Sequence, residues 1–202
     1  DADDIILSET TDALLNILET NTDLVLVYGL QRKVKNLNDI NIFENFDKRN
    51  FTVIHNPIKK AMRNSMFNPS QFLARTELCK KVGGCDERIK FSQEYSLTLK
   101  LSILGKFAKL NFPTAILPLV APGQISEKKN NQIYRVSKAL ELFLEDNPEL
   151  ESKYKLYAQR RLTARAWRFA KRFKKSSFFS KWFLLYLKGF FYFNSNVLEN
   201  CK

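Results

Sequence analysis

Residues 92–101 read Ser-Gln-Glu-Tyr-Ser-Leu-Thr-Leu-Lys-Leu, and this stretch predicts the helix around which the rest of the chain is arranged. Ser92 is a favourable residue for capping the first turn of a helix, and Gly105 is expected to end it. The apolar residues recur at the spacing of one buried helical face, namely Leu97, Leu101 and Leu104. The pattern therefore predicts a helix that packs with one side against a core.

Glu94 falls in the first turn of this predicted helix. Acidic first turns are common, because the partial positive charge of a helix N-terminus stabilises a carboxylate. By position alone, Glu94 is therefore expected to be a surface residue with a slightly lowered pKa. A catalytic role needs further support.

A shorter helix is predicted just before this stretch. Thr76 is placed to cap a helix over residues 77–82, and Gly83 and Gly84 are expected to close it. Glycine suits this position because it tolerates the left-handed backbone found just past a helix end. An acidic loop, residues 85–88, follows.

These two segments, residues 74–87 and 93–101, resemble the second half of a family 2 glycosyltransferase. In that family an arginine-led helix ends in Val-Gly-Gly, an acidic pair follows, and a Glu-Asp pair opens a helix reading Leu-x-Leu-Arg-Leu. Glu94 stands where the family has the aspartate that serves as catalytic base. Gln93 stands where the family usually has a glutamate, so that charge is missing here.

Three carboxylates, Asp1, Asp3 and Asp4, lie directly before the apolar run Ile5-Ile6-Leu7. From the residues alone, a solvated acidic terminus and a metal site are both open. The resemblance implies a metal site, because an Asp-x-Asp signature ends a strand in glycosyltransferases of the GT-A fold. Asp1 and Asp3 are then expected to bind the donor, and Asp3 and Asp4 to hold Mn²⁺ or Mg²⁺, since hard divalent cations take oxygen ligands.

The resemblance implies a metal-dependent, inverting hexosyltransferase-like enzyme. The donor would be a nucleotide-diphosphate sugar, and the acceptor a hydroxyl of a glycan or lipid-linked molecule in bacterial cell-surface polysaccharide synthesis. The Gln-x-x-Arg-Trp motif and spanning helices of the family's processive synthases are not found in the sequence. A non-processive transferase is therefore expected.

The expected fold class is α/β. Residues 1–120 are predicted to form the C-terminal half of a GT-A domain, and residues 121–202 a helical tail. The nucleotide-binding half of such a domain is expected to precede Asp1, so the 202 residues by themselves are expected to be inactive.

Hydrophobic patterning places the remaining elements of the α/β part. A helix capped by Ser8 is predicted before a buried strand over residues 24–29, and this order is typical of α/β folds. Residues 30–66 are predicted to be mostly loop, with a short strand over residues 51–54. Two short strands are predicted over residues 107–111 and 114–117.

The net charge of +12 lies entirely in the last quarter of the chain. Residues 1–152 contain 20 Lys and Arg and 20 Asp and Glu, whereas residues 153–202 contain 13 Lys and Arg and one acid. The three cysteines have no paired spacing, which fits a reducing, cytoplasmic setting. No apolar run reaches the roughly 18 to 20 residues that a spanning helix needs.

The tail is predicted to contain a helix from Ser126, a second over about residues 150–175, and an apolar segment over residues 178–193. Fourteen of the 26 aromatic residues lie in residues 154–193, beside the basic excess. Residues 153–193 therefore fit an element that lies on an anionic membrane, at the inner face of the cell membrane, and they equally fit packing against the rest of the chain. Nucleic-acid binding is disfavoured because no recognised motif accompanies the basic residues.

Overall fold

The computed structural model describes residues 4–35, 47, 49–89, 92–119, 129–175 and 178–194. Asp1 and Asp3, two of the predicted donor- and metal-binding residues, lie outside the described residues. So does Ser126, the predicted start of the first tail helix.

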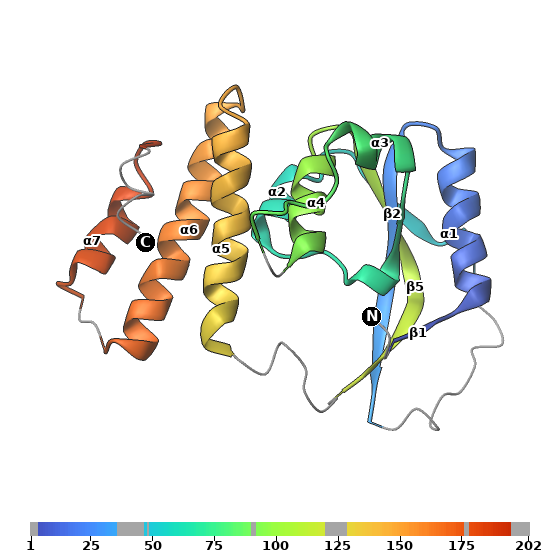
Figure 1. Cartoon of the computed structure of the whole chain (residues 1–202), viewed down its shortest axis with the longest axis horizontal. Coiled ribbons are helices and arrows are strands. Elements are labelled where there is room, and N and C mark those ends of the chain that lie inside the picture. The colour runs from blue at the N-terminus through green and yellow to red at the C-terminus, as the bar shows by residue number, and fades with distance from the viewer. Residues whose placement is uncertain are drawn as a thin grey trace.

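The described residues form a five-stranded mixed sheet (Figure 1). Along it the order is β1-β5-β2-β4, and β3 pairs with another part of β5. β2 and β5 are parallel and form its centre, whereas the other pairs are antiparallel. The strand bounds are Ile5–Ile6 (β1), Leu24–Val34 (β2), Phe51–Ile54 (β3), Phe72–Ala74 (β4) and Lys106–Pro118 (β5).

The two central strands are longer than the sequence predicts. β2 continues to Val34 instead of ending at Gly29, and β5 is one strand instead of two. Residues 31–34 pair with residues 115–118, and this part of β2 is largely exposed, so its polar sequence resembled a loop. Pro113 lacks the N–H that a regular ladder needs, and it lies opposite Leu30, where the register shifts.

Gly29 of β2 lies directly against the side chain of Thr114 in β5. A Cβ atom added there would lie 2.1 Å from the Cγ2 atom of Thr114. We expect Gly29→Ala to lower the free energy of unfolding by about 1 to 3 kcal/mol, because either the strand or Thr114 must move. Urea denaturation measures this change. Gly105→Ala is the comparison, and its loss of stability should be smaller because its added Cβ would lie 2.9 Å from a Val25 methyl group.

Helices cover both faces of the sheet, which confirms the mixed α/β architecture (Figure 1). On one face lies α1 (Ser8–Thr20), whose buried side chains Ala13, Leu14, Ile17 and Leu18 pack against β2 and β5. On the other lies α4 (Gln93–Leu101), whose Leu97 and Leu101 pack against a second set of strand residues. The leucine face predicted for this helix is confirmed.

The predicted caps are wrong in detail. Ser8 and Thr76 are the first residues of α1 and of α3 (Thr76–Lys81), not the residues that precede them. Ser92 does occupy the position before α4, but with a left-handed φ of 59°, and its side chain makes no cap hydrogen bond to the described residues. Gly83 and Gly84 have left-handed φ values of 72° and 64°, as the sequence predicts.

Two short elements in residues 58–71 were not predicted. α2 (Ile58–Arg63) buries Ile58, Ala61 and Met62, and a 3-10 turn, η2 (Pro69–Gln71), leads into β4. A helix of six residues spans less than two turns, which is too short for its periodicity to stand out. Met62 of α2 and Ser70 of η2 form hydrogen bonds with Tyr95 and Asp4, respectively.

The tail helices are α5 (Lys129–Asp146), α6 (Ser152–Phe173) and α7 (Lys181–Lys188). A hydrophobic cluster joins α2 and α4 to α5 and α6, and its fully buried members include Tyr95, Leu99 and Leu140. α7 packs on α6, at the end of the molecule opposite α1 (Figure 1). None of the helices in the described ranges is long and apolar enough to cross a membrane.

Candidate active site

Glu94, the predicted catalytic base, lies in the first turn of α4 and is partly buried. Burial raises the pKa of its carboxyl group above the usual range, and a hydrogen bond from its own backbone N–H opposes this rise without cancelling it. The lowered pKa expected from position alone is therefore wrong. A partly buried glutamate with a raised pKa is a stronger base than an exposed one.

Helix α4 is fixed on two sides, so it holds Glu94 on a rigid element. Leu97 faces the sheet, whereas Tyr95 and Leu99 face the tail helices. The Tyr95 hydroxyl donates a 3.1 Å hydrogen bond to the carbonyl oxygen of Met62 at the end of α2. Burial raises the pKa of Tyr95 to about 12, so this hydroxyl keeps its proton and is not available as a base.

Asp4, the predicted metal ligand that the structure describes, lies directly before β1. The Ser70 hydroxyl donates a 2.6 Å hydrogen bond to its Oδ2 atom. Ser70 belongs to η2, which is held in place because the Gln71 side chain donates a 3.0 Å hydrogen bond to the carbonyl oxygen of Gly29. Ser70 thus orients Asp4, a role that the sequence alone did not reveal.

Asp4 and the first turn of α4 point to the same end of the sheet. Gly105 lies against Val25, near the start of β2, so α4 ends near the start of the parallel strands and runs back across the sheet (Figure 1). Its first turn therefore lies toward the carboxyl ends of β2 and β5. Asp4 lies at that end too, because Ile5 pairs with Ile116.

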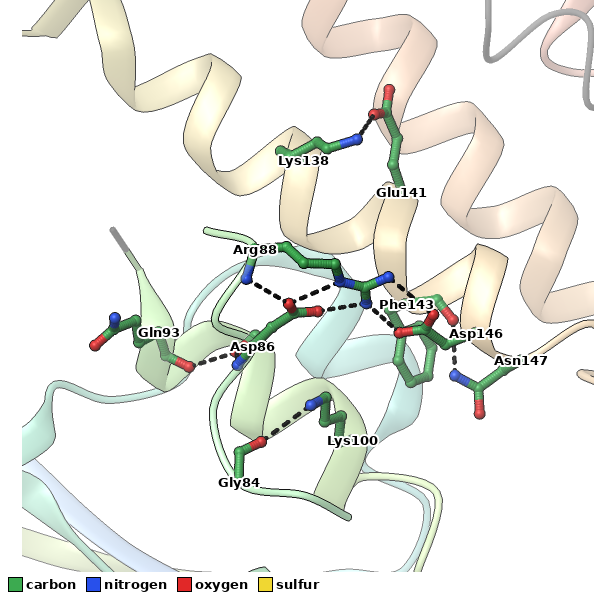
Figure 2. Close-up of polar contacts among 11 residues, drawn as sticks. Gly84, Asp86, Arg88, Gln93, Lys100, Lys138, Glu141, Phe143, Asp146 and Asn147 are labelled. Carbon is green, nitrogen blue, oxygen red and sulfur yellow. Dashed lines mark hydrogen bonds and ion pairs between the residues drawn. The ribbon is translucent and has the colours of Figure 1, made fainter. Parts of the chain in front are cut away.

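The acidic loop before α4 is structural (Figure 2). Asp86 is buried, and Arg88 binds it in a bidentate pair with distances of 2.9 Å from Nε to Oδ1 and 2.6 Å from Nη2 to Oδ2. Arg88 also forms an ion pair with Asp146 of α5 and donates a 3.2 Å hydrogen bond to it from Nη1. The Arg88 guanidinium holds the pKa of Asp86 below its usual range.

This loop also contacts α4 directly. The backbone N–H of Asp86 donates a 3.0 Å hydrogen bond to the hydroxyl of Ser96. The loop therefore ties the helix that carries Glu94 to the first tail helix. Sequence reasoning missed the link, because the ion-pair partner Asp146 lies far away in the sequence.

Cys85 lies near Glu94 and is not an activated nucleophile. Burial and the charge of Glu94 both raise the pKa of its thiol, so it is protonated at neutral pH. Cys79 and Cys85, the cysteines in the described part of the chain, are both free. Neither thiol is suited to covalent catalysis, and Glu94 remains the candidate base in this region.

Carboxylate oxygens are the ligands that Mn²⁺ and Mg²⁺ prefer, and Asp4 provides one such group in an orientation fixed by Ser70. Within the ranges that the structure describes, no group of three or more His, Cys, Asp or Glu side chains is placed to hold a metal ion. Asp1 and Asp3, the other acids of the predicted site, lie outside these ranges.

No protein-family model matches this chain, and no curated protein matches it.

Proposed function

We propose that this chain forms part of a metal-dependent, inverting glycosyltransferase that moves a sugar from a nucleotide-diphosphate donor to an acceptor hydroxyl. One observation carries the proposal. Glu94, a partly buried carboxyl with a raised pKa, lies in the first turn of a fixed helix that points to the end of the sheet where Asp4 lies. The motif resemblance around residues 74–101 supports the same function.

Glu94 would take the proton from the acceptor hydroxyl as that hydroxyl attacks the donor sugar. A base works best when its pKa lies near the working pH, and the raised pKa of Glu94 moves it in that direction. Attack from the face opposite the leaving group inverts the anomeric configuration.

Asp4, held by Ser70, would bind a divalent cation together with Asp1 and Asp3, and Asp1 and Asp3 would also contact the donor. When bound, the cation offsets the negative charge that develops on the departing diphosphate. The proposed acceptor is a glycan or lipid-linked molecule in cell-surface polysaccharide synthesis, with one sugar added at each encounter.

The direct test is sugar transfer by the full-length protein. The protein is incubated with Mn²⁺ and labelled uridine-, guanosine- or thymidine-diphosphate sugars, together with extracted cell-surface glycans and lipid-linked acceptors. We expect one donor class to release nucleoside diphosphate and to label an acceptor. If none of these donors binds, the proposal is wrong.

The role of Asp4 has its own test. We expect Mn²⁺ to tighten nucleoside-diphosphate binding by about tenfold or more, and Asp4→Asn to remove most of this gain, because an amide oxygen carries no charge to hold the cation. Isothermal titration with and without Mn²⁺ measures the effect. Asp12→Asn, at an exposed acid of α1, is the matched control and should behave as the parent protein.

A further inference from the structure

The large apolar residues of the tail include a set that packs inward and a set that is exposed. Tyr154 and Trp167 are buried. The ring of Trp167 lies 5.3 Å from the ring of Phe183, which joins α6 to α7. These side chains help to pack the tail helices together, whereas the second set is exposed.

The second set lies at the surface. We call it the apolar ridge, and it comprises Phe179, Leu184, Leu187, Phe190, Phe191 and Tyr192. Phe179 is 95% exposed, Phe191 76% and Leu184 54%, which is unusual for such large apolar side chains so close together in the chain. Exposed apolar patches commonly mark binding surfaces, and these six residues all belong to one short segment, residues 179–192.

Exposed lysines border the apolar ridge. Lys181 and Lys188 lie at the two ends of α7, with Leu184 and Leu187 between them on its exposed side. Other exposed cations, Lys171, Arg172, Lys174 and Lys175, lie at the end of α6. No acidic residue occurs anywhere in residues 153–194, so every Lys, Arg, Asp or Glu side chain that this stretch contributes is basic.

The arginines in the middle of α6 are engaged differently. Arg161 and Arg165 donate hydrogen bonds of 2.6 and 3.3 Å to the carbonyl oxygen of Arg63, and Arg165 is buried. Arg160 donates a 2.8 Å hydrogen bond to the carbonyl oxygen of Phe190. Arg161 and Arg165 therefore tie α6 to α2, and Arg160 ties α6 to the segment after α7. The exposed lysines and Arg172 carry the outward charge.

We propose that the apolar ridge and its lysine border dock on the surface of an anionic lipid bilayer. Leucine and phenylalanine side chains gain free energy by entering the boundary between headgroups and acyl chains, and lysines extend toward anionic headgroups. α7 has eight residues and is roughly 12 Å long, so it suits a helix that lies in the plane of the surface. The proposal does not depend on the chemistry of Glu94.

The composition of the ridge favours a bilayer over other partners. Nucleic acid could stack on the exposed aromatic rings, but Leu184 and Leu187 can neither stack on a base nor bond to it. A second copy of the chain would bring two positively charged tails together, which is unfavourable. A bilayer accommodates both the leucines and the lysines.

The test is vesicle binding by the full-length protein without any donor sugar. Sedimentation compares phosphatidylcholine vesicles with vesicles that also contain phosphatidylglycerol. We expect binding to the anionic vesicles, with a partition coefficient that falls as salt rises. Replacing Lys174, Lys175 and Lys181 with glutamine should weaken binding about fivefold for each charge removed.

The apolar part is tested with Phe179→Ser combined with Leu184→Ser, which should lower the partition coefficient at least about tenfold. The matched control is Leu15→Ser combined with Ile103→Ser, two exposed apolar residues of the α/β part. The charge control replaces Lys33, Lys35 and Lys81, which are exposed on the α/β part. Both controls should bind as the parent does.

Three results would overturn the proposal. One is a preference for RNA or DNA when nucleic acid and anionic vesicles are offered together. Another is a dimer that Phe179→Ser with Leu184→Ser disperses, with no vesicle binding by the parent protein. The third is vesicle binding that the tail variants and the control variants weaken equally. Sugar transfer is measured separately, so failure here leaves the proposed chemistry untouched.

Discussion

For the proposed sugar transfer, Glu94→Gln is expected to lower the turnover of the full-length protein by about 10²- to 10⁴-fold, the usual contribution of a general base, while donor affinity stays nearly unchanged. The amide is close in size to the carboxyl group but cannot accept the proton of the acceptor hydroxyl. Nothing in the proposed donor contacts is removed. Steady-state rates of nucleoside-diphosphate release, set beside donor titrations, separate the two quantities.

A matched control for Glu94→Gln is available in the same part of the chain. Glu77 lies in the first turn of α3, is largely exposed and pairs with Lys80 at 3.1 Å. Glu77→Gln should therefore leave turnover unchanged. Weakened donor binding with normal turnover in Glu94→Gln would instead assign Glu94 to a structural role.

The raised pKa of Glu94 is expected to set the pH dependence of the proposed reaction. A base must be deprotonated to act, so the rate should fall as the pH drops through the pKa of Glu94. Because burial raises that pKa, the fall should occur at a higher pH than about 4.3, the ordinary value for glutamate. A profile of kcat/KM against pH measures the pH at which the rate falls. A fall centred at or below the ordinary pKa of glutamate would contradict the role of Glu94.

Arg88→Met is expected to lower the free energy of unfolding by about 2 to 3 kcal/mol. Removal of the guanidinium leaves the buried carboxylate of Asp86 without its bidentate partner, and unpaired buried charges are costly. This loss is smaller than for a fully buried ion pair because the Arg88 side chain is about half exposed to water. Urea denaturation at neutral pH measures the change.

Lys80→Met is the matched control for Arg88→Met, because the pair between Lys80 and Glu77 is exposed. It should change stability by less than about 0.5 kcal/mol. The pKa of Asp86 is lowered in the folded state, so its stabilising effect is present above its unfolded pKa and is lost as pH falls through the folded value. The difference between the parent and Arg88→Met should therefore shrink in acid. An equal loss for Lys80→Met would contradict this account.

Features with a local cause could be predicted from the sequence. The leucine face of α4, the buried start of β2 and the glycines after α3 depend on residues within a few positions of one another. The end of β2 depends on a distant partner, because residues 31–34, of which the first three are polar, pair with residues 115–118. The predicted side-chain caps are wrong because a cap requires a particular backbone conformation, and the residue type alone does not determine that conformation.

In the candidate site too, locally determined features could be predicted, and features that depend on distant segments could not. The position of Glu94 in a first helical turn could be predicted, but the direction of its pKa could not, because burial depends on how the rest of the chain covers α4. The contact between Ser70 and Asp4 and that between Arg88 and Asp146 join segments far apart in the sequence. No local pattern indicates either contact.

The hydrophobic cluster that α4 shares with the tail helices couples the unfolding of these elements. Tyr95 and Leu99 lose cover if α5 and α6 leave, and Leu140 of α5 loses cover if α4 leaves. Helix α4 and the tail helices α5 and α6 are therefore expected to unfold in one cooperative transition. Truncation of the chain at residue 120 would expose the side of α4 that packs on the tail helices. The α/β part is therefore not expected to keep its stability without the tail.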